Sequence, residues 1–268
     1  MEIATIVSTH ANPQITEDTV DSVKTWITDK VMLLVDQAGW SQFQDRNICN
    51  VDKIEGFYHN YYKGCYRNYA LGLKTLFETY PNADWYWWLE YDALVISDAF
   101  KADLEKANKQ GIWMMACDLR KYKFAFPLLE EILGCGKIQT SRYLLGCCQF
   151  HHHNFLAKLT ELDFFNKLID ATEEYREGIF PDYPRHAFEE ELWPTLALHL
   201  GGRLKGLSCW INPRWVGSPL YKVRYQPEIR PYEILPSTSI IHPVKNPNPI
   251  RLYYRKQRDK IRKFKNNE

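Results

Sequence analysis

Residues 85–96 are almost wholly apolar, yet they carry two acids one residue apart, Glu90 and Asp92. A short run dense in aromatic and β-branched residues, bounded by turn-forming residues, is typical of a buried β-strand. Because burying an unpaired carboxylate is costly, we expect both acids to emerge at the end of the strand, where they can meet a cation or a hydrogen-bond donor. The two-residue repeat of a strand places Glu90 and Asp92 on one face and Tyr91 on the other.

Strand and helix patterns alternate along the first part of the chain. Apolar runs at residues 3–7 and 31–35 flank a helical pattern, for which Thr16 is a candidate N-cap. A strand–helix–strand unit of this length is right-handed, and its ligands collect beyond the carboxyl ends of the strands. The loop that begins at Asp36 is therefore expected at the edge to which Asp92 points.

The rest of the chain continues this alternation. Strands are expected at residues 112–117, 144–150, 203–207 and 239–245, and helices at residues 63–80, 97–110 and 189–200. Residues 37–61, 120–143 and 212–236 are expected to be irregular or mixed. The pattern predicts a single α/β domain over residues 1–250, with a mixed, mainly parallel sheet flanked by helices, and a separate tail over residues 251–268.

Glu90 and Asp92 also suit a metal ion. Hard divalent cations such as Mg²⁺ and Mn²⁺ bind few protein carboxylates and complete their shell with phosphate oxygens and water. The alternative is that both acids cap a solvated strand edge. An apolar strand followed by acid, any residue, Asp and a small residue, here Ala93, resembles the Asp-x-Asp motif of GT-A glycosyltransferases. The resemblance implies a GT-A-like fold, the nucleotide-diphospho-sugar transferase architecture.

A second resemblance to this family precedes the strand. The run from Gly64 to Asn68 contains Arg67 and resembles the Gly-, Arg- and Asn-containing element that lies before the Asp-x-Asp strand in many inverting GT-A enzymes. An Arg at the start of a helix suits a diphosphate, because its planar fork pairs with two oxygens and the helix terminus adds N–H groups. The alternative for Arg67 is a surface salt bridge.

Three successive acids, Glu189 to Glu191, begin the helix that Gly201 is expected to end. Pro194 is tolerated only near the first turn of a helix, which places the acids at its N-terminus. The helix dipole favours their ionised form and their mutual repulsion opposes it, so one of them could act as a base. The run resembles the catalytic-Glu segment of mucin-type branching N-acetylglucosaminyltransferases, which implies that Glu190 is the base and Glu189 the preceding acid. The alternative is three solvated acids at a helix start.

The strand pattern at residues 239–245 contains His242 and Lys245. In metal-dependent GT-A enzymes a C-terminal His completes the metal shell, so the resemblance implies that Asp92 and His242 hold Mn²⁺ or Mg²⁺. Lys245 could neutralise the leaving diphosphate. The chain departs here from the branching enzymes, which lack a metal and use basic side chains instead.

Together these resemblances imply a hexosyl- or N-acetylhexosaminyltransferase-like enzyme. It would move a sugar, with inversion, from a nucleotide diphosphate sugar, with UDP favoured, to a hydroxyl of a glycan or lipid-linked glycan. Residues 1–118 would form the nucleotide-sugar half and residues 119–250 the acceptor half. The family's loops further imply that Thr9 and Asp36 contact the nucleotide, and Glu90 would contact the ribose or a metal-bound water. Asp36 could instead be a simple turn residue.

The tail over residues 251–268 is strongly basic, because its many Lys and Arg residues face only two acids, Asp259 and Glu268. A basic helix with some apolar residues suits an anionic membrane surface, where a lipid-linked acceptor would be found. The alternative is a solvated or disordered terminus.

Composition narrows the class of protein. A formal net charge of +1 argues against general nucleic-acid binding. The seven cysteines are scattered and lack zinc spacing, which fits a reducing compartment. Residues 151–153 are three histidines, expected on the acceptor side rather than around a metal, because neighbours on a strand point to opposite faces. The start of the chain lacks a signal-peptide pattern and no run reaches membrane-spanning length, so we expect a cytoplasmic protein, with the tail suited to the inner face of the membrane.

Three other classes of protein fit parts of the sequence. A sugar nucleotidyltransferase shares the architecture, but the Gly-rich N-terminal loop of that class is replaced by Ser8, Thr9 and His10. A non-catalytic glycan-binding protein on the same fold would use the aromatic residues, 15% of the chain, as platforms for sugars and would tolerate loss of Glu190. A nucleic-acid binder would depend on the tail alone and would show steep salt dependence.

Overall fold

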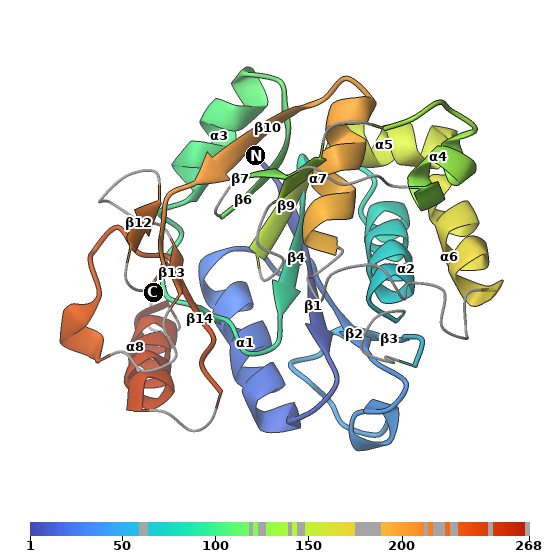
Figure 1. Ribbon diagram of the computed structural model, residues 1–268. Helices are drawn as coiled ribbons and strands as arrows, with labels where there is room; N and C mark the ends of the chain where they lie inside the picture. Colours follow the sequence, from blue (N-terminus) through green and yellow to red (C-terminus); the bar gives the residue numbers. More distant parts are fainter. Residues whose placement is uncertain are drawn as a thin grey trace.

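A mixed seven-stranded β-sheet runs through the centre of the protein (Figure 1). The computed structural model describes residues 1–58, 64–117, 120–122, 127–138, 141–143, 148–174, 189–211, 214–216, 223–225, 230–245 and 249–265. The strands of this large sheet lie in the order β10-β6-β9-β4-β1-β2-β3. Their bounds are Ile3–Thr9 for β1, Val31–Val35 for β2, Asp52–Glu55 for β3, Trp85–Glu90 for β4, Ile112–Cys117 for β6, Cys148–His152 for β9 and Arg203–Leu207 for β10. Neighbouring strands are parallel except where β9 pairs with β4 and β6.

The order of the strands reverses beside β1. This strand pairs with β2 on one side and with β4 on the other, in a parallel register that places Ser8 opposite Glu90. In open α/β sheets, ligands bind outside the carboxyl ends of the strands at such a point. The carboxyl ends of β1, β2 and β4 therefore mark the edge at which a site is expected.

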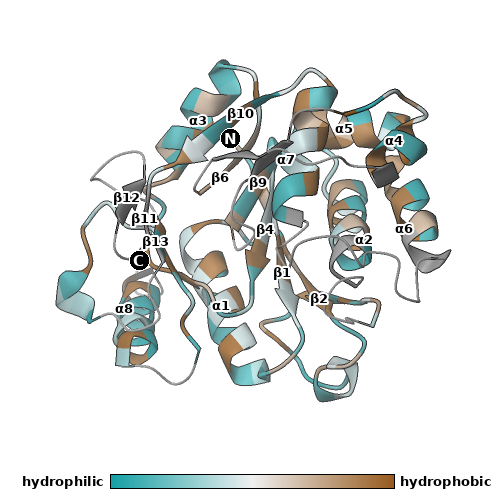
Figure 2. Cartoon of the chain, viewed as in Figure 1, coloured by the Kyte–Doolittle hydropathy of each residue, from teal (hydrophilic) through white to brown (hydrophobic). Residues whose placement is uncertain are grey.

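Helices cover both faces of the large sheet. One face carries α2 (Gly64–Thr79), α4 (Pro127–Leu133), α5 (His153–Glu161), α6 (Phe164–Glu174) and α7 (Glu189–His199), and the other carries α1 (Pro13–Trp26) and α3 (Lys101–Lys109). Each face has its own cluster of buried apolar residues. Figure 2 shows hydrophilic colour over much of α3 and α8. The predicted α/β fold, with a mixed, mainly parallel sheet flanked by helices, is confirmed.

A smaller sheet of five short strands stands beside the large one, in the order β12-β11-β13-β14-β5. Its strands are β5 (Leu94–Val95), β11 (Cys209–Ile211), β12 (Arg214–Val216), β13 (Val223–Tyr225) and β14 (Ile240–His242). The other described elements are the pair β7 (Arg120–Tyr122) and β8 (Ser141–Tyr143), the short helices η1 (Trp40–Gln42) and η2 (Pro231–Glu233), and α8 (Pro249–Lys265). Because β5 follows β4 in the chain, the backbone passes from the large sheet to the small one between Glu90 and Leu94.

The apolar run at residues 85–96 forms two strands rather than the single strand that its composition predicts. β4 ends at Glu90, and the N–H of Ala93 donates to the Glu90 carbonyl at 3.0 Å, which closes a turn before β5 begins at Leu94. Both strands are buried, so a continuous apolar pattern does not mark the change of sheet. Asp92 therefore lies in the turn between two sheets and not on the face of one strand.

The first helix begins earlier than Thr16, the predicted cap. Asn12 is the N-cap, its side chain accepts a hydrogen bond from the N–H of Ile15, and Pro13 occupies the first helical position. Thr16 lies inside the helix and is buried, with its hydroxyl 2.9 Å from that of Thr9. The polar group of Thr16 thus ties the helix to the end of β1.

Regular elements also occur where the sequence shows no pattern. β3 lies within residues 37–61, β7, α4 and β8 lie within residues 120–143, and β12, β13 and η2 lie within residues 212–236. β3 is an edge strand whose four residues are all exposed or half-buried. A strand of this kind needs no run of apolar residues, so periodicity does not reveal it.

The strands predicted at residues 31–35, 112–117 and 203–207 are confirmed with the same bounds. Gly201 follows α7 with a positive φ of 87°, a conformation that glycine adopts easily at a helix end. Pro194, however, is not in the first turn of α7, because the helix begins at Glu189. Since proline has no N–H, the Glu190 carbonyl cannot receive the usual helix bond from residue 194.

The basic tail forms a helix that packs on α1. Within α8, Arg251 and Arg258 are buried and both bind the carboxylate of Asp18. Part of the basic charge that the sequence places on the tail is therefore neutralised inside the protein. No helix within the described ranges combines the length and the hydrophobicity that crossing a lipid bilayer requires.

A buried polar network lies between α2, α7 and β9. The Tyr69 hydroxyl donates to Oε1 of Gln149 at 2.6 Å and lies 3.1 Å from Nε2 of His151, while Trp193 stacks on the Tyr69 ring at 5.1 Å. Burial lowers the pKa of His151 to about 3, so the ring is neutral in the folded protein above that pH. His151 is therefore part of the core beneath α7.

We expect the fold to lose stability between pH 7 and pH 5 through His151. An unfolded histidine has a pKa near 6.5, so the unfolded chain takes up a proton in this range that the buried ring does not. The wild type should lose about 2 kcal/mol more of its free energy of unfolding than His151→Gln, whose neutral amide keeps a partner for Tyr69. Urea unfolding at both pH values measures this difference. An equal loss in the two proteins would mean that the His151 ring takes up a proton in the fold.

Candidate functional site

Asp92 and His242 come together because β5 pairs with β14. The antiparallel register places Ile241 opposite Leu94, so His242 lies beside the turn that holds Asp92. Beyond the strands, the N–H of Val244 donates to the Asp92 carbonyl at 2.7 Å. Two segments far apart in the sequence are thus joined by backbone hydrogen bonds on either side of the two side chains.

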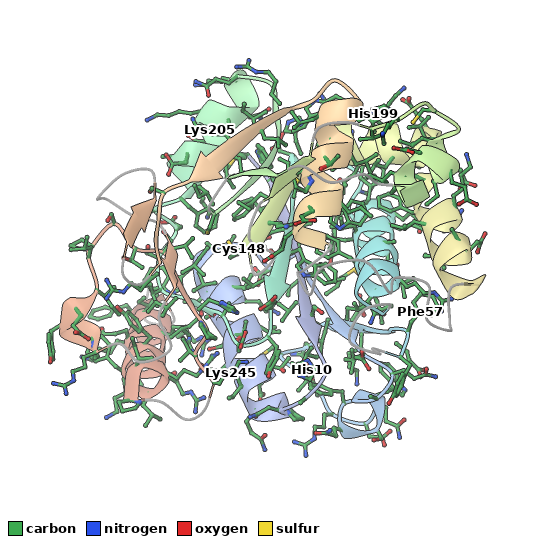
Figure 3. The ribbon with its side chains drawn as sticks, viewed as in Figure 1. His10, Phe57, Cys148, His199, Lys205 and Lys245 are labelled. Carbon is green, nitrogen blue, oxygen red and sulfur yellow. The ribbon has the colours of Figure 1, made fainter. Side chains whose placement is uncertain are left out.

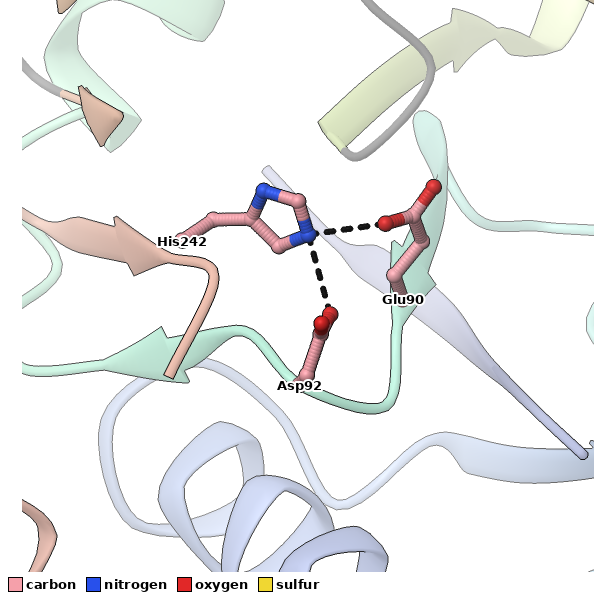
Figure 4. Close-up of side chains that lie close together, drawn as sticks. All are labelled: Glu90, Asp92 and His242. Carbon is pink, nitrogen blue, oxygen red and sulfur yellow. Dashed lines mark ion pairs between the residues drawn. The ribbon is translucent and has the colours of Figure 1, made fainter. Parts of the chain in front are cut away.

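His242 lies between two carboxylates (Figure 4). Its Nε2 is 2.7 Å from Oε2 of Glu90 and 2.9 Å from Oδ1 of Asp92. One ligand atom from each of the three residues lies within 4.8 Å of the other two. The side chain of Asp92 is only 4% exposed, whereas that of Glu90 is 40% exposed. The cluster is therefore buried on the Asp92 side and open to solvent on the Glu90 side.

The charge of Asp92 is stabilised by its neighbours. Lys245 places Nζ 3.7 Å from Oδ2 of Asp92. Burial opposes ionisation of Asp92, but the hydrogen bond and charge of His242 and the charge of Lys245 outweigh it and hold the pKa of the carboxyl below its usual value. Asp92 is therefore an anion at neutral pH.

The donor atoms of this cluster fit a divalent cation. Carboxylate oxygens suit Mg²⁺ and Mn²⁺, and the imidazole of His242 favours Mn²⁺, the softer of the two. A single proton on Nε2 cannot serve two carboxylates fully, whereas a cation in its place would satisfy all three groups. In the part of the chain that the structure describes, this is the one group of three or more His, Cys, Asp or Glu side chains placed to share an ion.

Thr9 and Asp36 lie at the ends of β1 and β2, where the sequence places them, and both are buried. The Thr9 hydroxyl lies 2.9 Å from that of Thr16 and donates to the Ala11 carbonyl at 3.0 Å. Oδ1 of Asp36 accepts a hydrogen bond from the N–H of Ala38 at 2.7 Å. Both side chains therefore have structural contacts, and Asp36 is a turn residue. Their contacts with a nucleotide stay a prediction.

Arg67 stacks on Phe57, with its guanidinium carbon 3.8 Å from the ring centroid. Phe57 lies in the loop after β3, and Asn68 holds its backbone: Oδ1 of Asn68 accepts from the Phe57 N–H at 2.6 Å and Nδ2 donates to its carbonyl at 3.1 Å. Asn68 ends the run that resembles the GT-A element, but the sequence assigned no role to its side chain. The available signal was a polar residue on the buried face of a helix, directly after Arg67.

The loops that follow the strands gather at one edge of the protein. In Figure 3, His10, Phe57 and Lys245 lie on the lower side of the view, whereas His199 and Lys205 lie on the upper side. The His10 ring meets the Tyr91 ring edge-on at a centroid distance of 5.0 Å, which joins the loop after β1 to the turn after β4. These loops surround the carboxyl edge at which the cluster of Glu90, Asp92 and His242 lies.

Glu190 and Glu191 lie in the first turn of α7, and both are buried. The first turn of α7 faces the same edge as the carboxyl end of β4 (Figure 1). The structure thus brings Glu90, Asp92, His242 and Lys245 into one cluster, while Glu190 belongs to a helix on the α2 face of the sheet. The side chain of Glu189 lies outside the described residues.

Comparisons with known proteins give distant structural similarities. No family model and no curated protein matches the sequence. A crystal structure of a glycosyltransferase involved in the glycosylation of the major capsid of PBCV-1 is 9% identical, with 97% of this chain and all of that chain covered and a TM-score of 0.45. The 4-diphosphocytidyl-2C-methyl-D-erythritolsynthase from Anaerococcus prevotii is 11% identical over 76% of this chain and 86% of that one, with a TM-score of 0.39. A197 from STIV is 12% identical over 77% and 82%, with a TM-score of 0.36. Similarities this distant assign no activity, so the function must follow from the site.

Proposed function

We propose that the protein is a metal-dependent, GT-A-type glycosyltransferase that moves a sugar from a nucleotide diphosphate sugar to a hydroxyl of a glycan or lipid-linked glycan. The observation that carries the proposal is the cluster of Glu90, Asp92 and His242 at the carboxyl edge of the sheet, with Lys245 beside it. A cation held by few protein ligands takes phosphate oxygens as the others. The point at which the strand order reverses is also where open α/β sheets bind nucleotides.

The donor side would use residues from both sheets. Asp92, His242 and Glu90 would hold Mn²⁺ or Mg²⁺, which offsets the charge that develops on the leaving diphosphate. For His242 to bind through Nε2, its ring proton must lie on Nδ1. Lys245 and Arg67 would pair with phosphate oxygens. The loops after β1 and β2 would contact the base and the ribose, with UDP favoured.

The acceptor side would depend on α7. Glu190 would remove the proton of the acceptor hydroxyl as its oxygen bonds to the anomeric carbon and the diphosphate leaves with the former bonding pair, which inverts that carbon. Its place in the first turn supports this role, because the helix dipole favours a carboxylate there. Glu189 would be the acid that precedes the base.

The exposed side of α8 would contact an anionic membrane surface that holds a lipid-linked acceptor. Lys256, Lys260 and Lys263 are exposed there, together with Leu252 and Phe264. Lysines with apolar neighbours on one side of a helix suit the headgroup region of such a membrane.

Nucleotide binding tests the proposed function directly. The melting temperature should be measured with UDP, GDP, CMP and dTDP, each with and without Mn²⁺. One nucleoside diphosphate at about 100 times its dissociation constant should raise the melting temperature by about 5 °C or more, and only with Mn²⁺ present. The rise should vanish in Asp92→Asn, which keeps the size of the side chain but removes its charge.

Asp98→Asn is the matched control, because Asp98 is an exposed acid a few residues further along the chain. It should respond to the nucleotide and Mn²⁺ as the wild type does. No rise with any nucleotide in the wild type would contradict the proposed donor site and favour a glycan-binding protein without transferase activity. A rise that persists in Asp92→Asn would place the nucleotide away from the cluster.

A further inference from the structure

Arg251 links the C-terminal helix to both segments that carry the metal-site residues. It lies in the first turn of α8 and is only 2% exposed. Its Nε donates to the Val244 carbonyl at 2.9 Å, and its Nη2 donates to the Ala93 carbonyl at 3.2 Å. Ala93 directly follows Asp92, and Val244 lies two residues after His242. One guanidinium therefore bridges the two backbone segments from which Asp92 and His242 extend.

A second set of hydrogen bonds fixes Arg251 against α1. Its Nη1 donates to Oδ2 of Asp18 at 2.8 Å and lies 3.3 Å from the Thr19 hydroxyl. That hydroxyl lies 2.5 Å from the Tyr91 carbonyl and 2.6 Å from the Ala93 carbonyl, so it donates to one of them at a time. Thr19 of α1 and Arg251 of α8 thus both hydrogen-bond the backbone of the turn that holds Asp92.

These contacts place the planar guanidinium of Arg251 between the two backbone segments whose separation sets the distance between Asp92 and His242. The N–H of Val244 already bonds the Asp92 carbonyl, and Arg251 adds a second connection between the same segments. A guanidinium makes such bonds in one fixed planar geometry, unlike the flexible ammonium of lysine. Metal binding depends on ligands held to within a fraction of an ångström by their surroundings.

We propose that Arg251 is a positioning residue for the metal site and that α8 is part of its scaffold. By bridging Ala93 and Val244, the guanidinium sets the separation between Asp92 and His242. The inference rests on the proposed function, since it assumes that these two residues hold a cation. It gives the basic C-terminal helix a role in cation binding in addition to any contact with a membrane.

The experiment measures Mn²⁺ binding to the full chain without nucleotide or acceptor, by the loss of the electron paramagnetic resonance signal of free Mn²⁺. Arg251→Met removes the bridge, while Asp18 keeps Arg255 and Arg258 as partners to hold α8 in place. The variant should bind Mn²⁺ about tenfold more weakly, or worse. Arg251→Lys should also bind weakly, because it restores the charge but not the planar fork. If Arg251→Met does not fold by circular dichroism, Arg251→Lys decides the test.

Arg258→Met is the matched control. Arg258 is also buried, and its hydrogen bonds to described residues go to Asp18 and Asp21, on α1 and away from the metal-site turn. This variant should lose stability yet keep its Mn²⁺ affinity within about twofold of the wild type. Wild-type affinity in both Arg251 variants, or an equal loss in Arg258→Met, would overturn the inference and leave the proposed metal site intact. No Mn²⁺ binding by the wild type would overturn both.

Discussion

Glu190→Gln is expected to lower the turnover number for sugar transfer by about 10²–10⁴-fold, the usual contribution of a general base. Glutamine matches the size of the glutamate side chain but cannot accept the proton of the acceptor hydroxyl. The nucleotide-dependent rise in melting temperature should be unchanged, because the cluster of Glu90, Asp92 and His242 lies on other elements. Turnover is measured as release of nucleoside diphosphate from the nucleotide sugar, in the presence of a mixture of mono- and disaccharide acceptors.

Glu191→Gln is the matched comparison. Glu191 is the next residue of the same helical turn and is also buried, so the change has the same chemistry in a similar environment. Because Glu191 is not the proposed base, this variant should keep more than about a tenth of the wild-type turnover. Removal of the base itself would lower turnover by at least about 10²-fold. Loss of turnover in Glu191→Gln alone would move the base by one residue. Normal turnover in both variants would exclude this end of α7 as the source of the base.

An apolar run predicts the strands that are buried on both faces, although the mostly exposed edge strand β10 is predicted with its bounds as well. β2 and β6 are apolar along their whole length, as central strands of a parallel sheet are, and their predicted bounds are confirmed. The same property hides the break at residues 91–93, because β4 and β5 are both buried but belong to different sheets. β3 is missed for the opposite reason, since an edge strand with Asp52, Lys53 and Glu55 has no apolar run.

The candidate site is predicted in its residues but not in its geometry. Strand ends meet at one edge of a sheet, so Glu90 and Asp92 are expected there from the sequence alone. His242 is predicted as a site residue only through the resemblance to GT-A enzymes. The pairing of β5 with β14 explains why its side chain lies beside Asp92. The role of Asn68 depends on the backbone of Phe57, which is a contact that no local pattern encodes.

The tail shows what a charge pattern leaves out. Its many Lys and Arg residues predict a helix exposed to an anionic surface. Two of these side chains are instead buried, because the partners of Arg251 and Arg258 are Asp18 and Asp21, in a helix near the other end of the sequence. A run of like charges in the sequence does not show which residues of opposite charge, from distant parts of the chain, will pair with it in the fold.

Asp18→Asn should lower the free energy of unfolding by about 3–5 kcal/mol, as expected when one partner of a buried ion pair is removed. The side chain of Asp18 is 1% exposed, and it accepts hydrogen bonds from Arg251, Arg255 and Arg258. Without its charge, the two buried guanidinium groups of Arg251 and Arg258 lose their shared counter-ion. Urea unfolding at pH 7 measures the effect. Asp21→Asn is the control and should cost clearly less, because Asp21 is partly exposed and Arg258, which it also binds, keeps Asp18 as a counter-ion.

The pH dependence of this loss separates charge from packing. Burial opposes ionisation of Asp18, but the charges of Arg258, Arg251 and Arg255 and the hydrogen bond from Arg251 outweigh it and hold the pKa of Asp18 below its usual value of 3.8. A carboxyl whose pKa is lower in the fold contributes stability that is fully present above its unfolded pKa and is lost as the pH falls through its folded pKa. The difference between the wild type and Asp18→Asn should therefore be constant above about pH 5 and narrow below about pH 4. A difference that stays constant in acid would assign the loss to altered packing between α1 and α8, because protonation of a paired Asp18 must remove the advantage that its charge provides.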